Sequence, residues 1–322
     1  MCAVNTMSKS PSRPLLGFLL AVSTAMLWGV VPLGLKVVLE AMDAYTITFC
    51  RFFGSWLLLG LWLLWRHHLP NTNQLSPSLW GVLLVAAFGL ASNYLLYLQG
   101  LDHLEAKTAQ VVTQLAPLLL LVSGVYLLKE RFSRGQWLGA ALLLLGLLLF
   151  FNEKLLWLWH GHDNYAIGVG LLVLAAICWV IYVLAQKRLL RRLRSAQLMW
   201  LVYGGGSLIF LPLAQLGSLK LLNGVQLAAL LFCVLNTLIA YGAFAESLNH
   251  WAATKVSAVL ATAPLFTLMA VDLLVLWWPD QVADTPLGWL GYLGALLVVT
   301  GSIVATFGGR NGSRRLAPKA PD

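Results

Sequence analysis

Residues 100–118 read GLDHLEAKTAQVVTQLAPL, and residues 247–265 read SLNHWAATKVSAVLATAPL. Leu101 in the first stretch corresponds to Leu248 in the second, an offset of 147 residues (248 − 101). The first-copy positions that are identical at this offset are Leu101, His103, Ala106, Val112, Ala116, Pro117 and Leu118. Further matches, at offsets of 151 and 155 residues, are Trp28 with Trp179 and Gly139 with Gly294. The chain is therefore an internal duplication.

The composition places both copies in a membrane. Of the 322 residues, 60% are hydrophobic and only 10% are charged, whereas about a quarter of the residues of a soluble domain are charged. Disordered chains are poor in apolar and aromatic groups, so the same figures exclude disorder. The 4 cysteines are scattered without paired spacing, which argues against a disulfide scaffold. The class that remains is an integral membrane protein.

Ten apolar segments follow one another along the chain, and most approach the roughly 20 residues that a spanning helix needs. They are approximately 15–38, 46–65, 79–100, 106–128, 137–151, 167–185, 197–216, 225–248, 253–277 and 287–307. Segments of this length do not match the shorter alternating strands of a membrane barrel. We therefore predict an all-α integral membrane protein with ten transmembrane helices.

Basic residues alternate between the two sides of this arrangement. With the N-terminus in the cytoplasm, 15 Lys and Arg residues fall in cytoplasmic segments and 4 fall in external ones. Basic residues collect in cytoplasmic loops and set the orientation of membrane proteins. The bias predicts that both termini are cytoplasmic. It also explains the net charge of +9 without a nucleic-acid partner.

Each copy holds five predicted spans, which is an odd number. The second copy must therefore enter the membrane from the opposite side, and this gives two inverted five-helix repeats. Inverted repeats are typical of secondary transporters, in which the halves exchange conformations to open the protein to one side and then to the other. The alternative interpretation is a duplication that only builds a larger bundle.

Several motifs resemble one known family. They are LWG at residues 27–29, Arg51 in the second span and the run APLLLLVSGVYLLKERFSRGQWLGA at residues 116–140. The second half repeats the last motif as APLFTLMAVDLLVL and LGALLVVTGSIV. Over roughly residues 15–308 the chain resembles the EamA-type members of the drug/metabolite transporter superfamily. The family's usual Gly-Glu pair before the fifth repeat helix is only partly kept, as Lys129-Glu130 and Trp278-Pro279-Asp280.

The resemblance implies a domain organisation and a function. It divides the chain into a cytoplasmic tail (1–14), a first repeat (15–152), an external loop (153–166), a second repeat (167–308) and a basic cytoplasmic tail (309–322). Spans five and ten are expected at the periphery or at a homodimer contact, around a cavity formed by the others. Because family members export amino acids, metabolites or drugs, the resemblance implies efflux of a small polar or amphipathic molecule across the bacterial inner membrane.

Polar and aromatic groups inside the predicted spans are the candidate substrate contacts, because such groups are costly in a bilayer. They are Trp28, Asn93, Tyr97, Gln110, Gln114, Trp179, Asn236, Tyr241 and Thr262. Amides and hydroxyls bind polar substrates, and a tryptophan stacks on a ring or a cation. The alternative is that the amides only bond helix to helix and that the tryptophans only pack.

Four further residues are candidates for gating or coupling. Arg51 and Asp272 lie at similar depths below the outer surface, so they are candidates for an ion pair or an outer gate. Asp272 is also the candidate carrier of a coupling proton. Pro117 and Pro264 fall near the middle of their spans, where each removes an intrahelical hydrogen bond and provides a kink or hinge. The alternative for the charged residues is a structural pair, or snorkelling to the surface.

The expected partners are a small-molecule substrate, the lipid bilayer, a coupling proton and a second copy of the chain. No catalytic residue, metal or cofactor is expected, since no clustered nucleophile, metal triad or Walker phosphate loop is present in the sequence. The competing class is a membrane protein that does not transport, either an embedded enzyme or a receptor or structural subunit.

Overall fold

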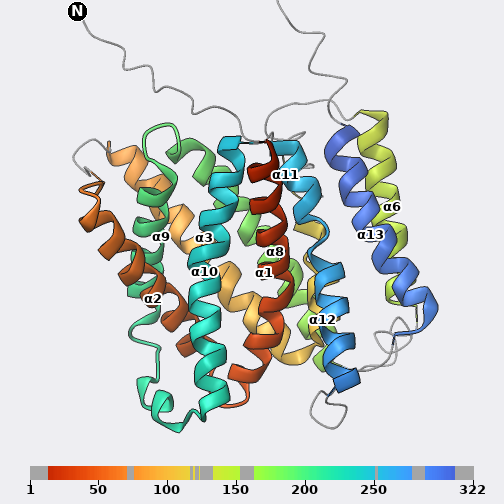
Figure 1. Cartoon of the computed structure of the whole chain (residues 1–322), viewed down its shortest axis with the longest axis horizontal. Helices are drawn as coiled ribbons and strands as arrows, with labels where there is room; N and C mark the ends of the chain where they lie inside the picture. Colours follow the sequence, from red (N-terminus) through yellow and green to blue (C-terminus); the bar gives the residue numbers. More distant parts are fainter. Residues whose placement is uncertain are drawn as a thin grey trace, which may run out of the picture.

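The computed structural model describes residues 14–70, 76–116, 119, 123, 133–152, 163–250, 253–277 and 287–308. These residues form a bundle of helices and contain no strand (Figure 1). The helices are α1 (Pro14–Leu39), α2 (Ala44–Trp65), α3 (Pro77–His103), α4 (Ala106–Val112), α6 (Arg134–Phe150), α8 (Asp163–Leu189), α9 (Ser195–Phe210), the 3-10 helix η2 (Leu216–Leu221), α10 (Gly224–His250), α11 (Ala253–Leu260), α12 (Ala263–Trp277) and α13 (Trp289–Gly308).

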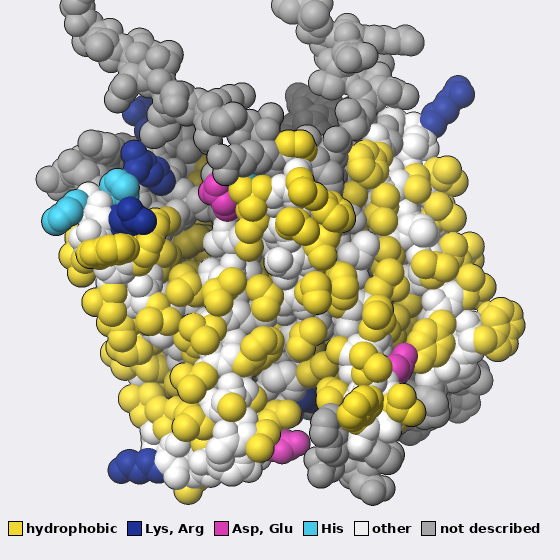
Figure 2. All heavy atoms as spheres, viewed as in Figure 1, with side chains coloured by type: hydrophobic (Ala, Val, Ile, Leu, Met, Phe, Trp, Pro, Cys, Tyr) yellow, Lys and Arg dark blue, Asp and Glu magenta, His cyan; other side chains and the backbone are white. Residues whose placement is uncertain are grey.

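The helices have the length and the surface of membrane spans. Seven spans among the described residues are long and apolar enough to cross a bilayer, and α6 is a shorter apolar helix. Figure 2 shows one face covered by apolar side chains over its middle, with most charged side chains near its upper and lower edges. The ten predicted spans correspond to α1, α2, α3, α4, α6, α8, α9, α10, α11 with α12, and α13, the fourth being described only in part. The predicted all-α membrane fold is confirmed.

Helices of the first repeat pair with helices of the second. The main pairs are α1 with α10, α2 with α9, α3 with α8, and α6 with α13. Exchanging each helix for its counterpart in the other repeat turns the α1–α10 pair into the α8–α3 pair, and turns the α2–α9 and α6–α13 pairs into themselves. This interchange is what two inverted repeats related by a pseudo-two-fold axis require.

The contact between α6 and α13 shows the same symmetry residue by residue. A Cβ at Gly139 would overlap the backbone of Ala305, and a Cβ at Gly294 would overlap the backbone of Phe150. These contacts are related by the 155-residue offset, because 139 + 155 = 294 and 150 + 155 = 305. Small residues let two helices approach closely in a membrane. The duplicated glycines therefore hold the peripheral pair together (Figure 1).

The fourth and ninth spans are interrupted at equivalent places. Helix α4 ends at Val112 and a turn follows at residues 113–114, while α11 ends at Leu260 and a turn follows at residues 261–262. Pro264 lies four residues after Leu260, where its ring and its missing N–H end the preceding helix. The predicted break beside Pro264 is thus observed. Pro117 lies outside the described residues.

The seventh predicted span is shorter than expected. The apolar run was expected to reach Leu216, but α9 ends at Phe210 and the next helical segment is η2. The cause is Pro212, which has no N–H to donate to the carbonyl of Leu208 and so interrupts the helical hydrogen-bond ladder directly after Leu211. The apolar residues after this point lie in turns and in the 3-10 helix.

Candidate functional site

Arg51 lies on α2. It is buried, with a relative exposure of 6%. Its Nε donates a hydrogen bond of 3.1 Å to Thr237 Oγ1 on α10. The guanidinium carbon lies 4.4 Å from the centre of the Tyr94 ring on α3. The arginine therefore joins one helix of the second repeat to two helices of the first.

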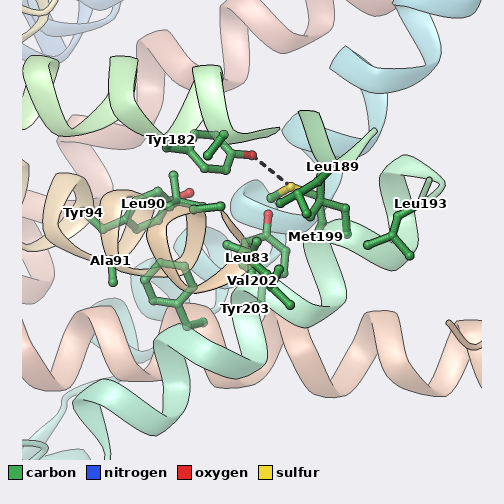
Figure 3. Packing of buried hydrophobic residues seen from close by; sticks show 14 of the residues in the cluster. Leu83, Leu90, Ala91, Tyr94, Tyr182, Leu189, Leu193, Met199, Val202 and Tyr203 are labelled. Atoms are coloured by element: carbon green, nitrogen blue, oxygen red, sulfur yellow. Dashed lines mark hydrogen bonds between the residues drawn. The ribbon is translucent and has the colours of Figure 1, made fainter. Parts of the chain in front are cut away.

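Tyrosines from both repeats gather around this arginine. Figure 3 shows Tyr94, Tyr182 and Tyr203 converging with apolar side chains from the same cluster. Tyr203 donates a 3.2 Å hydrogen bond to the Thr237 carbonyl, and Tyr182 donates one of 3.1 Å to Met199 Sδ. Tyr94 and Tyr241 correspond at the 147-residue offset, and Tyr241 packs against the buried cluster to which Tyr94 belongs. The cluster therefore draws equivalent residues from both repeats.

No carboxylate in the described part of the chain forms an ion pair with Arg51. The titratable groups close enough to feel its charge include the hydroxyls of Tyr97 and Tyr203 and the thiol of Cys233. Among the described residues its terminal nitrogens Nη1 and Nη2 have no hydrogen-bond partner, since only Nε donates. The site thus carries one uncompensated positive charge.

Gln110 on α4 faces this region. Tyr97 on α3 donates a long hydrogen bond of 3.5 Å to Gln110 Oε1, and Gln110 Nε2 donates one of 3.4 Å to the Trp28 carbonyl on α1. Gln114 instead accepts a 3.4 Å hydrogen bond from Ser302 on α13. The two glutamines do not share a helix face, because α4 ends between them.

Asn93 and Asn236 bond one helix to another. Asn93 Nδ2 donates a 2.8 Å hydrogen bond to the Ala175 carbonyl on α8, and Asn236 Nδ2 donates one of 2.6 Å to the Leu27 carbonyl on α1. The two bonds join the helix pairs α3–α8 and α10–α1, which the repeat interchanges. Both amides therefore bond one helix to another, which is the alternative to substrate contact.

The two repeat-related tryptophans are half-buried although they lie deep in the bundle. The Trp28 ring packs edge-on against Tyr241, with 5.3 Å between ring centres, and also contacts Phe244 at 5.8 Å. Trp179 packs against the apolar cluster of Figure 3. Thr262 caps the end of α11 by donating a 2.6 Å hydrogen bond to the Val259 carbonyl. Of these side chains, Trp28 and Tyr241 form an aromatic wall beside the Arg51 site.

Asp272 does not pair with Arg51. Its Oδ1 lies 2.7 Å from Lys107 Nζ on α4, and its Oδ2 accepts a 2.9 Å hydrogen bond from Tyr292 on α13. The Lys107 side chain is 2% exposed and that of Asp272 is 42% exposed. The predicted ion pair of Arg51 with Asp272 is wrong because similar depth does not bring α2 close to α12. The pair that forms joins the broken fourth and ninth spans.

Sequence reasoning missed Thr237, Lys107 and Tyr203. Lys107 looked like one of the few external basic residues, although it is buried in an ion pair. Thr237 is one turn before Tyr241 on α10, and this spacing could have indicated that both face the site. Tyr203 carries no signal of this kind, since its role depends on how α9 crosses α10.

Comparisons with known proteins give a consistent result. A model described as the EamA-like transporter family matches residues 15–152 and again residues 166–307. The chain is 43% identical to an uncharacterized inner membrane transporter, YhbE, of Escherichia coli K12 over 296 residues, which cover 92% of each chain. It is 38% identical to an uncharacterized transporter of Haemophilus influenzae, covering 92% of this chain and 96% of the other. One solved crystal structure matches with a TM-score of 0.64 at 18% identity, covering 94% of this chain and 100% of the other, and this likeness concerns the fold.

Proposed function

The chain belongs to the EamA-like transporter family, and we propose on that premise that it is a secondary active transporter that exports a small metabolite by alternating access. Membrane transport follows from the family and from the relatives that it resembles over almost its whole length. Efflux, the substrate and the mechanism are our proposal. The two moving halves are the repeats at residues 15–152 and 167–308.

The observation that carries the mechanism is the matched interruption of the fourth and ninth spans. Helix α4 ends in a turn after Val112, the ninth span is divided into α11 and α12, and α4 contacts α12. Broken helices at a repeat interface are typical of transporter binding sites, because their ends can tilt without breaking a continuous ladder of hydrogen bonds. A bundle that only provides scaffolding has no need of two matched breaks.

The Lys107–Asp272 pair serves as the outer gate in this proposal. It links α4 to α12 at the end of the bundle where the external loops are predicted. At the 147-residue offset Lys107 corresponds to Thr254 and Asp272 to Val125, so the second copy of the sequence does not repeat the charge pair. The charge pair therefore favours one of two otherwise symmetric conformations. Protonation of Asp272 would weaken that preference and couple transport to a proton gradient.

The orientation follows from the distribution of basic residues. Helix α1 begins and α13 ends at the same end of the bundle (Figure 1). We assign this end to the cytoplasm, since the predicted basic segments lie there. The name of the Escherichia coli relative supports the inner membrane as the location.

Reconstitution tests the function. Proteoliposomes would be loaded with a mixture of isotope-labelled amino acids, organic acids and aromatic amines, and a pH gradient would be imposed. Release of at least one class, measured by mass spectrometry against protein-free liposomes, is expected, and it should collapse when a protonophore dissipates the gradient. Release of none of the solutes, by protein with intact helical content, would favour the non-transporting class.

A further inference from the structure

We propose that Arg51 is the anchor for a carboxylate group of the substrate, which is therefore an amphipathic organic anion with no need for an ammonium group. The inference rests on the proposed transport function and names the chemical class that the central site accepts. It extends the gating role predicted for Arg51 from the sequence.

The charge balance of the site requires an anion. A buried arginine in a membrane protein is costly unless another group offsets its charge. The only fixed charge at this site in the described part of the chain is that of Arg51, since Asp272 is engaged by Lys107. A cation entering the site would add to the uncompensated charge, whereas a carboxylate would neutralise it.

The guanidinium is held so that one edge stays available. Thr237 Oγ1 accepts from Nε, and the same hydroxyl donates to the Cys233 carbonyl at 2.8 Å, so its orientation is fixed. The Tyr94 ring lies against the guanidinium at 4.4 Å. Nη1 and Nη2 remain without partners among the described residues, and a planar guanidinium with free amino groups matches the two oxygens of a carboxylate.

An aromatic wall lies one helical turn away. Tyr241 follows Thr237 by four residues on α10, which is a separation of about 6 Å along the helix. The Trp28 ring packs against Tyr241, and Gln110 bonds to the backbone of the same tryptophan. An organic anion can therefore place its carboxylate on Arg51 and its apolar body on the Trp28–Tyr241 wall. No carboxylate among the described residues lies there to receive a substrate ammonium.

Four compounds that share one phenyl ring separate the possible charge classes. They are 3-phenylpropionate (anion), phenylalanine (zwitterion), 3-phenylpropanamide (neutral) and phenylalaninamide (cation), with acetate as a minimal carboxylate. Thermal stabilisation of the purified protein in detergent measures the binding of each. We expect 3-phenylpropionate to bind at least as tightly as phenylalanine and about tenfold or more tighter than the amide, as a charge-assisted hydrogen bond predicts.

Variants then assign that preference to Arg51. Arg51→Gln should make the protein bind 3-phenylpropionate no more tightly than 3-phenylpropanamide. Arg51→Lys keeps the positive charge but loses the paired N–H donors of the guanidinium, so it should keep only part of the preference for the anion. Arg66→Gln is the matched control, because Arg66 also lies over an aromatic ring, that of Trp65 at 4.9 Å, but at the exposed end of α2. If Arg51→Gln does not fold, Thr237→Val tests the same point, since it removes the hydroxyl that orients Nε.

The outcomes are decisive for the anion site and separable from the outcome for transport. Equal or tighter binding of phenylalaninamide, stabilisation by no carboxylate in the series, or an Arg51→Gln protein that keeps the anion preference would each overturn the proposal. Anion binding without flux in proteoliposomes would leave the site standing and refute transport. Flux of cations or neutral solutes alone would support transport and refute the anion site.

Discussion

At the scale of single residues, the Lys107–Asp272 pair should contribute measurably to stability. Lys107 is almost fully buried while Asp272 keeps contact with the surroundings. A double-mutant cycle with Lys107→Met and Asp272→Asn should give a coupling free energy of about 1–2 kcal/mol, discounted for the exposure of Asp272. Thermal unfolding in detergent measures it. The Glu246–His250 pair, four residues apart on α10 with side-chain exposures of 53% and 7%, is the control, with a coupling expected to be about 0.3–0.5 kcal/mol, as for other such pairs within one helix.

The two buried asparagines should contribute to stability without affecting selectivity. Replacing Asn93 or Asn236 by Ala removes one interhelical hydrogen bond, and such bonds are worth about 0.6 kcal/mol on average and up to about 1.7. We expect a loss in this range by thermal unfolding, with the order of affinities for the phenyl compounds unchanged. A changed order of affinities would show that these amides contact the substrate.

At the scale of elements, the glycines between α6 and α13 should not tolerate a methyl group. In Gly139→Ala the new Cβ overlaps the backbone of Ala305, which cannot move without shifting the helix. Overpacking of this kind costs about 1–3 kcal/mol. Gly170→Ala on α8 is the control, because no atom lies within 4 Å of its added Cβ. Melting temperatures should fall for the first variant and stay level or rise for the second.

The elements show which features the sequence was able to predict. Apolar runs predicted the spans, the duplication predicted their inversion, and Pro264 predicted the break in the ninth span. Each of these features depends on local composition or on a constant offset between the two copies. The seventh span ended early because Pro212 overrode an apolar run. A closer reading of that proline would have corrected the boundary.

The candidate site was less predictable, since it depends on which helices touch. Arg51 was singled out as a rare intramembrane charge, and its side chain is buried, with 6% exposure. Its neighbours come from α3 and α10, and the actual partner of Asp272 comes from α4. No spacing within one span encodes such contacts, so the partners could not be read from the sequence.

At the scale of the whole molecule, alternating access predicts that the outer end opens when its ion pair is broken. Ala106 precedes Lys107 and is buried, with 8% exposure, so a cysteine there should be protected while the gate is closed. In a background with the native cysteines replaced, Asp272→Asn should increase the labelling rate of Ala106→Cys by an external, membrane-impermeant maleimide. Labelling in intact cells is the measurement.

The controls decide whether such a change reports the opening of a gate. Gly217→Cys lies in η2, which is exposed, so its labelling rate should be the same with and without Asp272→Asn. An organic anion that binds at Arg51 should alter the rate at Ala106→Cys and leave that at Gly217→Cys unchanged, since the repeats move as units. An Ala106→Cys rate that is independent of both Asp272 and ligand would mean that the pair is only structural. The two halves would then have to exchange conformations through another contact between α4 and α12.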